Sequence, residues 1–123
     1  MNYLTDEDRN KFYDYLYKWQ KRLGLEHWSI RRTAKKTKNM AMCVFDDPEH
    51  KMVKVLLGNN WHSCPVTDHN LESTAVHEIL HILLHDLIEH ARTKPKDDIG
   101  IAKEEHAVIN RLEQIIIGLP DHK

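Results

Sequence analysis

Apolar residues recur at helical spacing close to the N-terminus. The positions that repeat every three or four residues are Phe12, Leu16, Trp19 and Leu23. Thr5 to Asp8 has the form of a capping box that opens a helix, and Gly24 is a typical residue just after a helix end. The pattern therefore predicts a first helix over residues 6–23.

The next part of the chain changes to the two-residue period of half-buried strands. Apolar and polar residues alternate over 28–34 and again over 41–45, and a denser apolar run covers 52–57. A turn rich in Asp and Pro separates the second run from the third. We therefore expect a small sheet of three strands, which leans toward antiparallel pairing.

Two helices are predicted in the second half. The first should begin near Asp68 or Asn70 and end near Ala91, and because its apolar residues point in nearly every direction we expect it to be buried all round. Residues 93–99 form a linker, and the last helix should run from Gly100 to the stop signal at Gly118-Leu119-Pro120. The fold class expected is α+β, in a single domain over residues 1–123.

Composition narrows the classes of function. Apolar residues make up 41% and charged residues 30% of the 123 positions, and the net charge is −1, which creates no general attraction for nucleic acid or an anionic membrane. The only cysteines, Cys43 and Cys64, form neither a disulfide framework nor a CxxC pair, which favours a reducing, cytoplasmic setting. The sequence shows neither an N-terminal apolar leader nor an apolar run long enough to span a bilayer.

One basic cluster stands out against this balance. It consists of Arg31, Arg32, Lys35, Lys36 and Lys38. We interpret it as a solvated strand edge and turn, because neither an aromatic platform nor a helix-turn-helix accompanies it. Nucleic-acid binding through this cluster is kept as a weaker hypothesis, and it predicts binding that falls steeply with salt.

The clearest chemical signal is the run His77-Glu78-Ile79-Leu80-His81. Two histidines four residues apart lie on one face of a helix, so both imidazoles can reach one zinc ion. A glutamate next to the first histidine is placed to act as general base toward a water molecule at that ion. The motif predicts a zinc site built for hydrolysis.

A catalytic zinc ion needs a third protein ligand, and the last helix offers Glu104, Glu105 and His106. At ~100° per residue, Glu105 falls in the middle of an apolar stripe, whereas its two neighbours fall about 100° to either side. A carboxylate facing only hydrocarbon would be costly, and a metal ion would remove that cost. We therefore predict Glu105 as the third ligand, with Glu104 as the main rival and His106 as a further alternative. The stripe consists of Ile101, Val108, Ile109, Leu112, Ile115 and Ile116.

These residues resemble a gluzincin-type zinc metallopeptidase, in which HExxH lies on one helix and a glutamate on the next. The small size and the strands ahead of the motif are similar to the minimal metallopeptidases of phages and mobile elements, including the ImmA/IrrE-type family, over roughly residues 25–117. The resemblance implies a minimal zincin-like fold, with His77, His81 and Glu105 holding Zn²⁺ and Glu78 as general base. The stretch Val108-Ile109-Asn110-Arg111 departs from that family's usual sequence.

The sequence thus predicts a zinc-dependent endopeptidase that cleaves peptide bonds in a protein or peptide substrate. An extended peptide could pair with the edge of the strand at 41–45 or of the strand at 52–57. Negative charge on the carbonyl oxygen would need a donor, for which His106, Arg111 and a tyrosine are the alternatives. A non-catalytic zinc-containing regulatory or binding module is the alternative function, and the sequence leaves the oligomeric state open.

Overall fold

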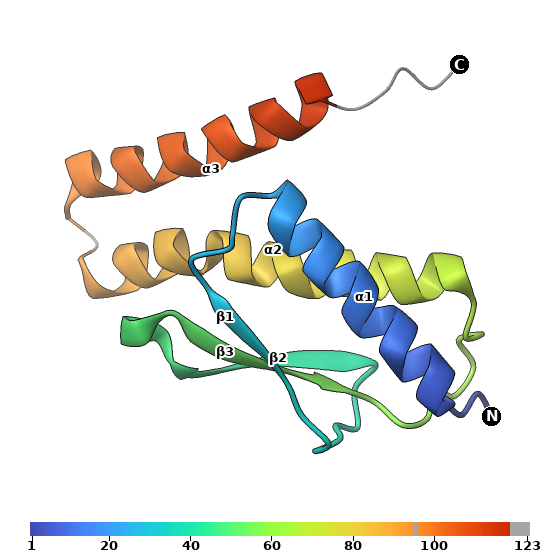
Figure 1. The fold of residues 1–123 in the computed structure, drawn as a ribbon. Helices are drawn as coiled ribbons and strands as arrows, with labels where there is room; N and C mark the ends of the chain where they lie inside the picture. The colour runs from blue at the N-terminus through green and yellow to red at the C-terminus, as the bar shows by residue number, and fades with distance from the viewer. Residues whose placement is uncertain (95, 119–123) are drawn as a thin grey trace.

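The computed structural model describes residues 1–94 and 96–118, without the side chains of residues 113, 114 and 116–118. Three α-helices and one three-stranded sheet follow in the order α1, β1, β2, β3, α2, α3, with a short 3-10 helix between β2 and β3 (Figure 1). The helix α1 comes first, then the sheet, then two helices, which confirms the predicted α+β fold.

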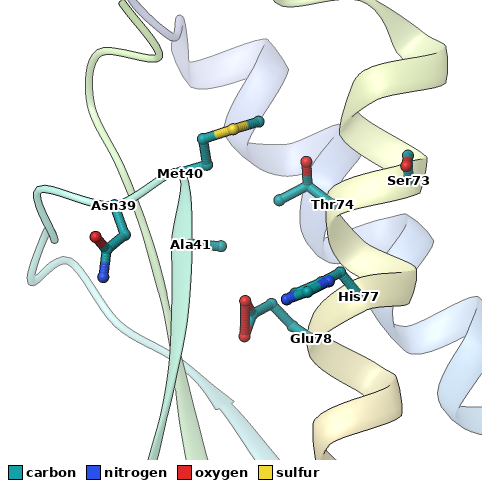
Figure 2. Close-up of a pocket in the computed structure, with 7 residues that line it drawn as sticks. All are labelled: Asn39, Met40, Ala41, Ser73, Thr74, His77 and Glu78. Carbon is teal, nitrogen blue, oxygen red and sulfur yellow. The ribbon is translucent and has the colours of Figure 1, made fainter. Parts of the chain in front are cut away.

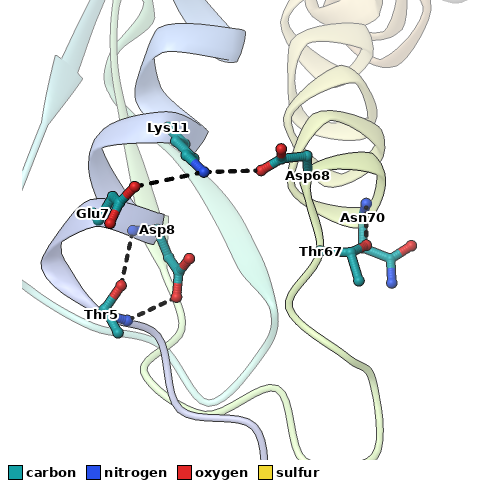
Figure 3. A network of polar contacts seen from close by, with 7 residues as sticks. All are labelled: Thr5, Glu7, Asp8, Lys11, Thr67, Asp68 and Asn70. Atoms are coloured by element: carbon teal, nitrogen blue, oxygen red, sulfur yellow. Dashed lines mark hydrogen bonds and ion pairs between the residues drawn. The ribbon is translucent and has the colours of Figure 1, made fainter.

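The helix α1 (Asp6–Arg22) begins with the predicted capping box. Thr5 Oγ1 accepts a hydrogen bond from the backbone N–H of Asp8, and the Asp8 carboxylate accepts one from the backbone N–H of Thr5 (Figure 3). One turn later Lys11 forms an ion pair with Asp68, the first residue of α2, at 3.2 Å. The beginnings of α1 and α2 therefore lie next to each other.

The sheet contains β1 (Ser29–Arg32), β2 (Ala41–Asp47) and β3 (Met52–Leu57) in the order β1-β3-β2. β3 pairs in parallel with β1 and antiparallel with β2, so the expected antiparallel pairing holds on one side of β3 only. The central place of β3 explains its dense apolar run, because neighbours cover it on both edges. Among the described residues β2 pairs with β3 along one edge and with no strand along the other.

The helix α2 (Asp68–Thr93) begins where the sequence predicted, with Thr67 as its N-cap. The prediction that it is buried all round was wrong. One side packs on α1 and the sheet, but Leu80, Leu84 and Ile88 are exposed. Part of the apolar surface of this helix is therefore not covered by the core.

The helix α3 (Asp98–Gly118) begins two residues earlier than predicted, because Asp97 caps it by accepting a hydrogen bond from the backbone N–H of Gly100 at 3.0 Å. It packs along α2, with Val108 in the core and Ile115 against it. Leu119 and Pro120 of the predicted stop signal lie outside the described residues.

The core lies between α1, α2 and the sheet. Its largest fully buried side chains include Phe12, Tyr13, Leu16, Ile79 and Ile82. The Tyr13 hydroxyl donates a hydrogen bond to the backbone oxygen of Val55 at 2.6 Å and so joins α1 to β3. Within residues 1–94 and 96–118, no helix has the length and apolar character that crossing a bilayer requires.

Candidate metal centre

The HExxH run lies in the middle of α2 and brings its three polar side chains together. His77, Glu78 and His81 each offer one ligand atom, and these atoms all lie within 4.8 Å of one another. The two imidazoles are exposed and roughly perpendicular, with an interplanar angle of 79°. The four-residue spacing alone produces this pairing, because one helical turn places the rings on the same face.

The two histidines already have the separation that a shared zinc ion requires. Their Nε2 atoms lie 3.2 Å apart. Nitrogen ligands about 2.0–2.1 Å from a tetrahedral zinc ion lie about 3.3 Å from each other. A hydrogen bond between two neutral imidazoles would give the same separation, so the distance shows that the donors fit zinc and does not identify the ion.

Glu78 differs from the histidines because it is buried. Its side chain is 5% exposed and points toward β2, where it borders a hollow of about 400 Å³ (Figure 2). A carboxylate in this position is largely withdrawn from solvent but still opens onto the space beside His77. A carboxylate so placed can reach a water molecule beside His77, and reach of that kind is the geometric requirement for a general base.

Cys43 on β2 is a neighbour of Glu78 that the sequence did not associate with the site. Its Sγ donates a hydrogen bond to the backbone oxygen of Glu78 at 3.4 Å. Burial and the negative charge of Glu78 raise the pKa of the thiol well above its ordinary value, so it stays neutral. The two-residue period of β2 was the available signal, because it places Ala41, Cys43 and Phe45 on one face of the strand.

The site lies in a groove between β2 and α2. Three neighbouring hollows follow this groove, and His77 and Glu78 border the first two. His81 borders the second and the third, so the face of α2 that carries the two histidines lies between the two ends of the groove. The first hollow is lined by Asn39, Met40, Ala41, Ser73, Thr74, His77 and Glu78.

One wall of the groove is held in place by Trp61. This side chain is buried, and its indole N–H donates a hydrogen bond to the backbone oxygen of Met40 at 3.1 Å. Met40 in turn lines the first hollow. Trp61 therefore supports the wall from behind rather than lining the groove.

The third predicted ligand lies apart from this group. Glu105 is exposed on α3, and the cluster of potential metal ligands found among the described residues contains His77, Glu78 and His81 without it. The alternative His106 is also exposed. The structure thus brings together three of the four predicted site residues and leaves the ligand role of Glu105 a prediction.

The face of α3 that turns inward differs from the predicted one. Buried and half-buried side chains on α3 include Ile101, Glu104, Val108, Arg111 and Ile115. On a helix with ~100° per residue, the middle of this face lies near Glu104. The expectation that Glu105 lies at the centre of a core-facing stripe was therefore wrong.

Glu105 instead shares an exposed side of α3 with Ile109 and Leu112, which the sequence had assigned to the core. None of the three hollows of the groove is lined by His106, Arg111 or a tyrosine, within the described part of the chain. None of the described residues predicted to donate a hydrogen bond to the carbonyl oxygen of the substrate therefore lines the groove. Outside the His77-Glu78-His81 group, polar side chains that line the first hollow are Asn39, Ser73 and Thr74, and Arg92 lines the third.

The basic cluster is partly neutralised. Arg31 forms an ion pair with Asp46 on β2, and Lys54 lies 3.5 Å from the same carboxylate. Lys36 donates a hydrogen bond to the side chain of Asn59. These contacts agree with the interpretation as a strand edge and turn.

Comparisons with protein-family models, with curated proteins and with solved structures found no match for this chain.

Proposed function

We propose that this protein is a zinc-dependent peptidase that cleaves peptide bonds in a protein substrate. The observation that carries the proposal is the pair of imidazoles at 3.2 Å beside the buried carboxylate of Glu78, all bordering an open groove. A surface pair of histidines without function would not need a buried carboxylate next to it, because burying a charge is costly.

In this proposal His77 and His81 hold the zinc ion through their Nε2 atoms. Bound there, zinc would lower the pKa of a water ligand toward ~7 and polarise the carbonyl group of the substrate. Glu78 would accept the proton of the attacking water and pass it to the leaving amine.

The edge of β2 is the better of the two candidate strands for binding an extended peptide. β3 lies between β1 and β2, so neither of its edges is free for a substrate. Within the described part of the chain, β2 has a strand partner along one edge only, and it forms one wall of the groove that contains His77 and His81. Main-chain hydrogen bonds to residues 41–45 would therefore hold the substrate beside the metal ion.

A third ligand from α3 is part of the proposal, with Glu105 as predicted and Glu104 as its rival. The half-buried position of Glu104 on the inward face of α3 strengthens the case for the rival.

We place the protein in the cytoplasm, since Cys43 and Cys64 are both free thiols.

Metal content and peptide cleavage test the proposal together. The parent protein should purify with about one zinc ion per chain and should cleave peptides only when it holds that ion. His81→Ala should lose both properties, whereas His69→Ala, which removes an exposed histidine from the first turn of the same helix, should keep both. Equal metal content in the parent and in His81→Ala would disprove the site.

The exposed position of Glu105 favours one alternative, a zinc-containing binding module without catalysis. Such a module would bind zinc through the same histidines but would not require Glu78. Zinc binding without any peptide cleavage in the parent would support it.

A further inference from the structure

The third hollow of the groove lies past His81, at the end opposite to Ser73 and Thr74. It has a volume of about 240 Å³ and is lined by Phe45, His81, His85, Ile88, Glu89 and Arg92. Whole small-molecule ligands occupy pockets of ~300–1,000 Å³, so this hollow is of a size for a single side chain. Because His81 borders it, a side chain bound here would lie close to a metal ion held by the two histidines.

One side of this hollow is an aromatic stack. The rings of Phe45 and His85 are nearly parallel, with centroids 4.0 Å apart and an interplanar angle of 18°. Trp28 meets both rings edge-on and is itself 2% exposed. The stack is therefore supported from inside the protein and forms a preformed aromatic wall of the hollow.

The polar groups around the hollow do not favour a charged ligand. Burial is the main cause that lowers the pKa of His85, so its imidazole is neutral near pH 7. Glu89 and Arg92 carry opposite charges, so the rim has no dominant sign. Ile88, which is 44% exposed, adds an apolar side chain next to the stack.

We propose that this hollow is the specificity subsite of the peptidase and that it takes a large apolar side chain, preferably aromatic, near the cleaved bond. The inference rests on the proposed function, because it assigns a substrate class to the same site. An aromatic side chain would pack against the Phe45–His85 pair and contact Ile88, and it would leave no buried charge unpaired. The other end of the groove, with Asn39, Ser73 and Thr74, offers no comparable apolar surface.

Cleavage-site profiling tests this assignment. The zinc-loaded full chain is incubated with a peptide mixture from a protease digest of a bacterial proteome, and mass spectrometry identifies the new termini. We expect Phe, Tyr, Trp and Leu to be enriched at one fixed position near the cleaved bond. The enrichment over Asp and Lys at that position should be about tenfold or more, which is the range that apolar pockets achieve.

Two matched variants separate the subsite from the rest of α2. Ile88→Glu places a carboxylate inside the hollow and should reduce the preference for apolar side chains about tenfold. It should also increase the cleavage of peptides that carry Lys or Arg at that position. Leu84→Glu makes the same change one turn earlier, at a side chain that is 36% exposed and does not line the hollow, and should leave the preference unchanged. Zinc content should equal that of the parent in both.

The outcomes distinguish this inference from the proposed function. Cleavage by the parent without any apolar preference, or an unchanged preference in Ile88→Glu, would overturn the subsite and leave the peptidase standing. The same loss of preference in both variants would also overturn it, since the effect would then belong to charge on the helix and not to the hollow. Failure of the zinc-loaded parent to cleave any peptide would overturn the function, and the subsite with it.

Discussion

Glu78→Gln separates a peptidase from a zinc-binding module most directly. The amide has nearly the shape of the carboxylate, so the side chain can keep its buried place beside Cys43 on β2. It cannot accept a proton at neutral pH. A catalytic site would therefore lose its general base while His77 and His81 keep their arrangement on α2.

The size of the effect follows from the role assigned to Glu78. General base catalysis contributes typically 10²–10⁴-fold, which corresponds to about 3–5 kcal/mol in the activation barrier. We expect kcat to fall by that factor. The free energy of unfolding should stay the same or rise slightly, since Glu78 is only 5% exposed and the variant removes a buried charge.

The assay needs three readouts on one preparation: peptide cleavage, zinc content and the thermal unfolding midpoint. Glu49→Gln, at an exposed glutamate in the 3-10 helix, is the control for the chemical change itself. Retained zinc with cleavage reduced at least 100-fold is the result expected. Cleavage within tenfold of the parent, with zinc retained, would refute the assignment of Glu78 as the base.

Three further predictions concern the third ligand and the stability of the fold. Glu104→Ala should lower the zinc content of the purified protein more than Glu105→Ala does, because Glu104 is half-buried on the inward face of α3 and Glu105 is exposed; elemental analysis showing the reverse order would keep Glu105 as the ligand. Tyr13→Phe removes the buried hydroxyl that bonds to β3 and should lower the free energy of unfolding by about 1–2 kcal/mol, measured by urea denaturation; no loss would show that this bond contributes nothing. Hydrogen bonds from Lys18 and, to a smaller extent, from the indole of Trp19 lower the pKa of Glu72 in the folded protein. The stabilising effect of Glu72 is therefore complete above its ordinary pKa of 4.5 and disappears as the pH falls through the lowered pKa. The stability difference between the parent and Glu72→Gln should therefore be complete near neutral pH and shrink as the pH falls below 4.5, and a constant difference would contradict the ion pair's role.

Local sequence patterns were sufficient to predict the helices and strands. The capping box at Thr5 and the change from a helical to a two-residue period located α1 and the strands, since caps and periodicity act within a few residues of the backbone. For the same reason the pairing of His77 with His81 could be predicted, because a single helical turn fixes it.

The order of the strands could not be predicted in this way. The dense apolar run of β3 agrees with a central strand, but only the packed sheet shows that β1 and β2 flank it and that β1 is the parallel neighbour. Among the described residues, that order leaves β1 and β2 with one unpaired edge each and β3 with none. It therefore also decides which strand can border the groove beside His81.

The rotation of α3 shows the limit of a single-helix argument. Its apolar residues cover more than one face, and the sequence pattern alone placed Glu105 at the centre of the buried side. Packing against α2 instead turns Glu104 and Val108 inward and leaves Ile109 exposed. A helix with a broad apolar surface has several rotations of similar local energy, and contacts with its neighbours select one of them.

What the sequence determined by itself is the set of interactions within one or two helical turns: the helices, the strands and the imidazole pair with its adjacent carboxylate. Only the tertiary structure decided which strand faces that pair, that Cys43 lies against Glu78, and that Phe45 stacks on His85. These residues are 35 and 40 positions apart in the chain, and no local period relates them. Their contact depends on how the sheet and α2 pack, and the burial of many side chains together determines that packing.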